Sequence, residues 1–240
     1  MKYYFLLAIF MIPLFSSGQE DNVDPVAVRI LDHMNDVIGE LTACSYNLSS
    51  SQDILDPDYG MIKSFTESHV IMMGPDKLLV KTTGNKGNRG FWYNGEDAIF
   101  YSFSQNNYAI MDAPDNIIAV IDSVSTKYDI EIPAADFFYP SFTDDILDSF
   151  DTVKFLGVKY IKDQACYHIK TANKDMEVQY WIADDAYNLP KRYLIIYKDQ
   201  ENMQYQGTFD NWTLNPVIPE SVFEFEPPAK AKEIKILARK

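Results

Sequence analysis

The chain has 240 residues, of which 47% are hydrophobic and 14% aromatic, and its formal net charge is −14 at pH 7. So acidic a chain lacks the positive surface that attracts nucleic acids and anionic lipid headgroups, and we expect neither as a partner. The length allows one domain with a sizeable core, or at most two small ones.

Residues 1–18 have the layout of a secretory signal peptide. Lys2 supplies a positive start, residues 3–15 are apolar, and Ser16-Ser17-Gly18 offers small residues for cleavage. The apolar run is well short of the roughly 20 residues that a membrane-spanning helix needs. We therefore expect cleavage after Gly18 and export to a bacterial periplasm. Loss of Lys2 changes the formal net charge from −14 to −15, and we expect residues 19–240 to form a single domain.

The first predicted element of the mature chain is an amphipathic helix over residues 24–41. Asp24 is a suitable N-cap, and Pro25 suits the first helical position. Apolar residues recur at helical spacing, namely Val28, Leu31, Met34, Val37, Ile38 and Leu41. We expect this apolar face to pack on a sheet.

From residue 42 to residue 113 the apolar period changes to two, which indicates strands. Gly74-Pro75 and Asn94-Gly95 mark turns, and the second is a strong signal for a short hairpin. The pattern predicts six strands in an antiparallel meander, over residues 42–53, 62–73, 77–83, 89–93, 97–103 and 107–111.

Residues 114–150 return to helical spacing. Pro114 and Pro133 can each open a helix, and Pro140 can interrupt the second one. Five further strands follow, over residues 152–160, 165–171, 177–182, 191–197 and 203–214. About eleven strands with segregated helices predict one α+β domain.

No group of residues predicts catalysis or a metal site. His33, His69 and His168 fall on a helix and two distant strands, without the spacing of a zinc motif. Cys166 and His168 share one face of a strand, but nothing marks the third residue that a nucleophile pair needs. We therefore expect a protein that is not an enzyme and uses no cofactor.

The glycine-rich segment over residues 84–90 resembles a phosphate loop at first sight. A strand follows it instead of a helix, and its lysine is not followed by serine or threonine, so a hairpin loop is the better interpretation. Lys81, Lys86 and Arg89 nevertheless place positive charge on an acidic chain. They are candidate contacts for an anionic headgroup.

The two cysteines, Cys44 and Cys166, lie in the first and about the eighth strand. In a sequential meander six strands separate them, whereas bridged Cα atoms lie within roughly 7 Å. We expect two unpaired buried thiols. Strong closure of the sheet would instead allow a bridge.

Several strands are apolar on both faces, so each face must be covered or must hold a ligand. Two interpretations stay open: the helices leave a cavity against a curved sheet, or they fill the space completely. The candidate cavity residues are Phe65, Val80, Phe100, Tyr180, Ile182, Leu194, Ile196 and Phe209.

Short motifs occur in a specific order along the mature chain. The last of them is Phe223-Glu-Phe-Glu-Pro-Pro-Ala-Lys-Ala231, after Leu189-Pro-Lys-Arg192 and Asp210-Asn-Trp-Thr-Leu-Asn215. Phe91-Trp-Tyr-Asn-Gly95 and Ile132-Pro-Ala-Ala-Asp-Phe-Phe138 precede them. In this order the motifs resemble a family of predicted periplasmic proteins of unknown function, related to the LolA/LolB lipoprotein carriers. The resemblance covers nearly the whole mature chain.

The resemblance implies an antiparallel half-barrel of about eleven strands wrapped around helices, with a hydrophobic cavity between them. It favours a soluble, monomeric periplasmic binding or carrier protein for a hydrophobic or acylated ligand, such as a lipid or lipoprotein, with residues 114–150 as a lid. The alternative is a partner-binding module with a filled core that acts in envelope assembly or sensing. In the tail, we expect Phe223 and Phe225 to dock on the sheet while Glu224 and Glu226 face water.

Overall fold

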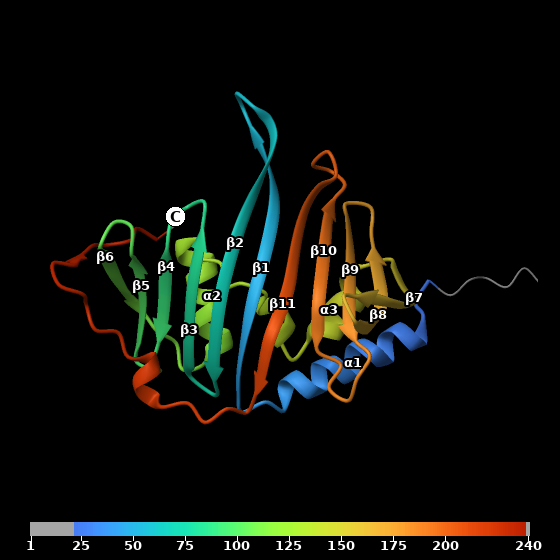
Figure 1. Cartoon of the computed structure of the whole chain (residues 1–240), viewed down its shortest axis with the longest axis horizontal. Coiled ribbons are helices and arrows are strands. Elements are labelled where there is room, and N and C mark those ends of the chain that lie inside the picture. The colour runs from blue at the N-terminus through green and yellow to red at the C-terminus, as the bar shows by residue number, and fades with distance from the viewer. Residues whose placement is uncertain (1–21, 239–240) are drawn as a thin grey trace, which may run out of the picture.

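The computed structural model describes residues 22–238, so the expected signal peptide lies outside the described residues. A curved, open sheet of twelve strands covers one face of the molecule, and the helices pack against its concave face (Figure 1). The strands are β1 Ala43–Asp56, β2 Gly60–Met73, β3 Lys77–Gly84, β4 Arg89–Tyr93, β5 Asp97–Ser102, β6 Asn107–Asp112, β7 Thr152–Ile161, β8 Gln164–Ala172, β9 Met176–Ala183, β10 Pro190–Tyr197, β11 Met203–Leu214 and β12 Lys232–Glu233. The predicted α+β half-barrel is confirmed, and β12 adds a short twelfth strand to the eleven predicted ones.

The order of the strands differs from a sequential meander. The sheet runs β12-β6-β5-β4-β3-β2-β1-β11-β10-β9-β8-β7, so the last long strand, β11, returns to pair with the first. Three strands, not the expected six, therefore separate Cys44 in β1 from Cys166 in β8. Both cysteines are free and buried, so the prediction of unpaired thiols is confirmed although its strand count is wrong.

The first helix, α1 Pro25–Gly39, forms as its sequence predicts. The Asp24 carboxylate accepts a hydrogen bond from the Val26 amide at 2.8 Å, which satisfies one of the free amides of the first turn. One face of α1 is buried, through Ala27, Leu31, Met34 and Ile38. It packs against β7 and the second helical region, and thereby covers one end of the concave face (Figure 1).

The second helical region contains α2 Ile117–Tyr128, a short 3-10 helix η1 Ala135–Phe138, and α3 Phe142–Ser149. The Asn116 side chain caps α2 by accepting from the Ala119 amide at 2.9 Å. The expected interruption occurs at Pro140, between η1 and α3. The Pro140 carbonyl accepts from Asn35 of α1 at 2.9 Å, which ties the two helical regions together.

Beneath β8–β11 the half-barrel is filled by aromatic side chains. The Phe137 ring, which η1 contributes, lies 5.3 Å from both Phe209 and Tyr193, measured between ring centroids. Tyr46 of β1 and Trp212 of β11 extend this cluster, with their centroids 4.6 Å apart. This half of the structure matches the filled-core interpretation.

After β11, residues 215–238 form a C-terminal strap that crosses the convex face of the sheet (Figure 1). Phe223 lies in a second buried cluster with Leu79, Trp92, Ile99 and Tyr101, and the Phe225 ring lies 5.0 Å from that of Trp92. The predicted docking of both phenylalanines is confirmed, and Glu224 and Glu226 are exposed as expected. A further 3-10 helix, η2 Glu220–Phe223, begins this contact, and β12 then pairs with the edge strand β6 in parallel.

Candidate functional site

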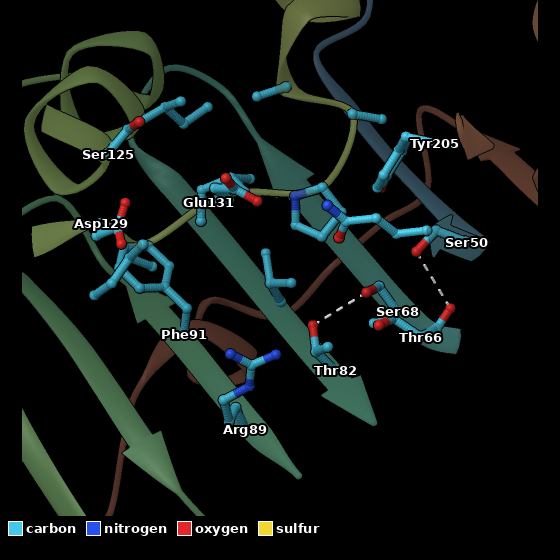
Figure 2. Close-up of a pocket in the computed structure, with 18 of the residues that line it drawn as sticks. Ser50, Thr66, Ser68, Thr82, Arg89, Phe91, Ser125, Asp129, Glu131 and Tyr205 are labelled. Atoms are coloured by element: carbon cyan, nitrogen blue, oxygen red, sulfur yellow. Dashed lines mark hydrogen bonds between the residues drawn. The ribbon is translucent and has the colours of Figure 1, made fainter. Parts of the chain in front are cut away.

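A cavity of about 880 Å³ lies between the concave face of the sheet and the segment formed by α2 and residues 129–136 (Figure 2). Its floor comes from β1–β5, and β10 and β11 contribute Tyr193, Ile195, Tyr197 and Tyr205 at one side. The cavity exists because α2 and η1 cover this half of the sheet without filling it. Of the two interpretations left open by the sequence, the cavity therefore applies to this half of the interior, and the filled core applies to the half beneath β8–β11.

One wall of the cavity is rich in hydroxyl groups. Strand residues alternate between the two faces of a sheet, so Ser64, Thr66 and Ser68 of β2 all point into the cavity. Ser50 and Gln52 of β1 and Thr82 of β3 complete the wall. The hydroxyl oxygens of Ser68 and Thr82 are 3.1 Å apart and share a hydrogen bond (Figure 2). The hydrophobic cavity implied by the resemblance is therefore only partly hydrophobic.

An apolar part of the lining lies toward β3–β5, α2 and the segment that follows α2. It includes Val80, Phe91, Phe100, Ile121, Ile130 and Ile132, together with Ile236. Ile236 belongs to the strap, which passes round the β6 edge and returns to the concave side. The C-terminal segment thus contributes to the cavity as well as to the convex face.

Charged side chains lie at opposite sides of the cavity. Lys86 and Arg89 come from the β3–β4 hairpin, and the buried Nε of Arg89 has no hydrogen-bond partner among residues 22–238. The facing segment supplies carboxylates, and Figure 2 shows Glu131 on the wall opposite Arg89. The other lining carboxylates are Asp122, Asp129 and Asp136. Burial raises the pKa of Asp136, and the charge of Asp145 raises it further.

Four of the residues predicted for the site line the cavity: Val80, Phe100, Lys86 and Arg89. Three others, Tyr180, Ile182 and Phe209, belong to the buried aromatic and aliphatic core under β8–β11 and do not line it.

The last four predicted residues lie on the opposite, convex face of the sheet, namely Phe65, Lys81, Leu194 and Ile196. On β2 the even-numbered residues point inward, so Phe65 points out and its side chain is 59% exposed. On β10 the odd-numbered residues point inward, so Leu194 and Ile196 point out. Lys81 follows the inward-pointing Val80 and is exposed.

The sequence interpretation missed the hydroxyl wall and the acidic segment. The alternation of Ser64, Thr66 and Ser68 was a usable signal, because polar residues at every second position indicate that one face of a strand meets water or a polar ligand. No local signal placed residues 129–136 over that face, since this contact joins segments far apart in the sequence.

A second, smaller pocket of about 350 Å³ lies where α1 ends, β1 begins and α2 begins. Its lining is mainly apolar and includes Ile38, Leu41, Cys44, Met72, Ile117 and Phe138. Burial raises the pKa of the Cys44 thiol to about 12, so this group is uncharged at neutral pH.

Among the described residues, no three His, Cys, Asp or Glu side chains lie together as a metal site would require. None of the helices between residues 22 and 238 combines the length and apolar character needed to cross a bilayer.

The curved sheet around helices, with a cavity between them, defines an α+β half-barrel fold. A family model described as "Predicted periplasmic protein (DUF2092)" matches residues 27–237. The chain belongs to this family, as its ordered motifs predicted. No curated protein sequence matches the chain significantly.

Solved structures with a similar fold share little sequence with the chain. An uncharacterized conserved protein from Thermus thermophilus is 10% identical, with a TM-score of 0.50, over 87% of this chain and 98% of that one. The Mycobacterium tuberculosis lipoprotein LppX is 15% identical, with a TM-score of 0.47, over 82% and 98%. A LolA superfamily protein from Nitrosomonas europaea is 13% identical, with a TM-score of 0.41, over 83% and 97%. Such low identities describe a likeness in fold alone.

Proposed function

We propose that this protein is a monomeric, non-catalytic periplasmic binding protein that holds a hydrophobic or acylated ligand in its half-barrel cavity. The observation that carries the proposal is the cavity itself, which places an apolar region beside a hydroxyl-rich wall. Its volume of about 880 Å³ is typical of ligand sites. Membership of a predicted periplasmic family supports the location.

The divided lining favours an amphiphilic ligand over a purely apolar one. An acyl chain against Val80, Phe91 and Phe100 gains about 0.8 kcal/mol for each buried methylene. The same chain against Ser64, Thr66 and Ser68 would remove their hydroxyls from water without replacing the hydrogen bonds, at about 1–3 kcal/mol for each group. The acyl chain of the ligand therefore lies toward β3–β5 and α2, and a polar part of the ligand faces β1 and β2.

The segment over residues 114–150 acts as the lid in this proposal. The Tyr46 hydroxyl donates to the Pro133 carbonyl oxygen at 3.2 Å, and this bond ties the lid to the sheet. The Tyr139 hydroxyl donates to the Asp122 carboxylate, which joins two parts of the lid to each other. Entry of a ligand requires the Tyr46 bond to open or requires passage past Lys86.

The surroundings of Cys166 and His168 support a non-catalytic function. Burial raises the pKa of the Cys166 thiol and lowers the pKa of the His168 ring. The imidazole stacks on Trp181 with centroids 4.4 Å apart, and its Nε2 atom is 2.9 Å from the Gln179 amide oxygen. The two side chains thus have structural roles.

Uptake of an environment-sensitive fatty-acyl probe tests the proposal. The variant Phe100→Gln places a polar side chain in the lining, and we expect the affinity to fall about 5–30-fold, as partial loss of an apolar aromatic contact predicts. Phe65→Gln is the matched control, because it makes the same change on the convex face and should leave uptake unchanged. Circular dichroism checks that both variants fold. If the folded wild type takes up no probe, the proposal is wrong.

A second candidate function is a partner-binding module in envelope assembly or sensing. The β1–β2 hairpin favours it, since this hairpin projects beyond the rest of the sheet (Figure 1) and exposes Ile54, Leu55, Tyr59, Met61, Ile62 and Phe65. Such exposure is unusual for a soluble chain and is typical of a contact surface. Photo-crosslinking from position 61 tests this function, with position 83 as an exposed control. A partner identified in this way should bind the purified protein, and its affinity should be lower for the Leu55→Ser variant.

Export is part of the proposal. We expect the exported protein to begin at Gln19, after cleavage behind Gly18. Intact-mass measurement of the purified protein checks this start, and retention of residue 1 in a membrane fraction would contradict it.

A further inference from the structure

Arg89 places a permanent positive charge at the floor of the cavity. Its side chain extends from β4 into the cavity (Figure 2), and its buried Nε atom has no acceptor among the described residues. Buried donors normally have an acceptor. A guanidinium suits phosphate well, because its planar fork of N–H groups matches two phosphate oxygens at once.

Hydroxyl donors lie directly beside this guanidinium. Arg89 pairs with Thr82 across β4 and β3, and Thr82 pairs with Ser68 across β3 and β2. All three side chains line the cavity, so they form one transverse row of donors along its floor. This row can bind the oxygen atoms of a phosphate and of the ester next to it.

The opposite wall has the opposite sign. Among the described residues that line the cavity, Asp122, Glu131 and Asp136 face Lys86 and Arg89, so these side chains together have an excess of negative charge. Glu131 is exposed on this wall, and its charge acts on the hydroxyl of Tyr197, which also lines the cavity. A headgroup with phosphate alone would lie against this acidic wall and be repelled, whereas an ammonium group would be attracted.

We propose that the cavity selects an amphiphile whose headgroup is zwitterionic, with a phosphate bound by Arg89 and an ammonium bound by Glu131. This inference rests on the proposed function, because it names the class of ligand for the same cavity. Ser68 and Thr82 donate to phosphate or ester oxygens, and the acyl chain lies against Val80, Phe91 and Phe100. The arrangement discriminates against phospholipids with a net negative head.

Competition between lysophospholipids of one acyl chain tests the headgroup. The probes are lysophosphatidylethanolamine, lysophosphatidylcholine, lysophosphatidylglycerol and lysophosphatidic acid, each below its micelle concentration, with monoacylglycerol as the uncharged reference. Against the bound fatty-acyl probe, we expect the two zwitterionic lipids to compete about tenfold better than the two anionic ones, as one charge-assisted contact predicts. This comparison uses the wild type, so it does not depend on any variant folding.

Two substitutions then test which charged residue binds which part of the headgroup. Glu131→Gln should reduce the preference for zwitterionic over anionic lipids, and Arg89→Met should weaken the binding of every phosphate lipid relative to monoacylglycerol. Glu67→Gln and Lys81→Met are the matched controls, because they make the same charge changes on the convex face and should leave the preference intact. Arg89→Lys should retain part of the phosphate affinity, since it keeps the charge and loses the fork.

The outcomes that contradict the inference are distinct. If the wild type binds all lysolipids and monoacylglycerol equally, or prefers the anionic ones, the headgroup inference is overturned and the proposed binding function stands. If it binds none of them, the binding function itself is wrong. If Glu131→Gln and Glu67→Gln change the preference for zwitterionic lipids equally, Glu131 does not bind the ammonium group.

Discussion

The Tyr46 hydroxyl donates a hydrogen bond to the Pro133 carbonyl oxygen at 3.2 Å, and so joins a central strand of the sheet to the segment that covers the cavity. The Tyr46 ring also stacks on Phe138, with centroids 5.8 Å apart. The Tyr46 ring lies against Phe209 and Trp212 of the aromatic core, whereas Pro133 lines the cavity. The contact therefore connects the aromatic core to the cavity wall.

The variant Tyr46→Phe tests this connection. It keeps the ring and removes the donor, which leaves the Pro133 carbonyl without this partner. We expect the free energy of unfolding to fall by about 0.5–1.5 kcal/mol, measured by chemical denaturation. Tyr187→Phe, at an exposed tyrosine, is the control and should change stability little. Equal stability of Tyr46→Phe and the wild type would show that the bond contributes nothing.

The C-terminal strap should be held mainly by its two phenylalanines. Phe225→Ala removes a partly buried ring from contact with Trp92, Tyr101 and Tyr108, and we expect it to cost about 1–2 kcal/mol. Limited proteolysis should then cut residues 215–238 faster than in the wild type. Val217→Ala alters a fully exposed residue of the same strap and should not change the rate. Protection of the strap in Phe225→Ala would contradict this account of its docking.

Acid should destabilise the protein partly through His168. Burial lowers the pKa of its ring in the folded state, so below the unfolded value of about 6.5 the unfolded chain binds more protons. The stabilisation is thus present above pH 6.5 and is lost as the pH falls. Between pH 7.5 and 5.5 we expect His168→Gln to lose less stability than the wild type does.

Denaturation midpoints at the two pH values measure the effect, and an NMR titration of the ring measures the pKa directly. His33→Gln is the control, at an exposed histidine of α1. A folded-state pKa of His168 above 6.5 would reverse the sign and contradict the prediction.

The thiols should react only after unfolding. Both cysteines are free and buried, and the pKa of Cys44 is raised to about 12 by its burial, so little thiolate forms at pH 8. We expect slow labelling of the native protein and two labels per chain in denatured, unreduced protein. Absence of labelling after denaturation would mean that a bridge exists and that the strand order is wrong.

Local patterns predicted most elements of this fold. The N-cap at Asp24, the break at Pro140 and the alternating strands depend on residues close in sequence, so their signals are readable. The pairing of β11 with β1 is a contact between distant segments and has no local signal. For that reason the sequence predicts where the strands lie along the chain but not their order within the sheet.

Predicting the lining residues was harder where both faces of a strand are apolar. On β9 the predicted cavity residues Tyr180 and Ile182 point inward, but they face a filled region and do not line the cavity. On β10 Leu194 and Ile196 were chosen, whereas the neighbouring Ile195 lines the cavity. A shift of one residue reverses the face, and side chains of similar hydrophobicity at both positions do not distinguish the two choices.

The most direct test of the account is the identity of what the protein carries. The exported protein should be purified without detergent and measured by native mass spectrometry, and its solvent extract should be analysed for lipids. We predict one bound amphiphile per protein molecule, with an acyl tail and a headgroup that contains phosphate and ammonium. The amphiphile should be lost from the Arg89→Met variant but not from the Lys81→Met variant. A chain that carries no amphiphile and takes up none from any of the lysolipids would contradict the account.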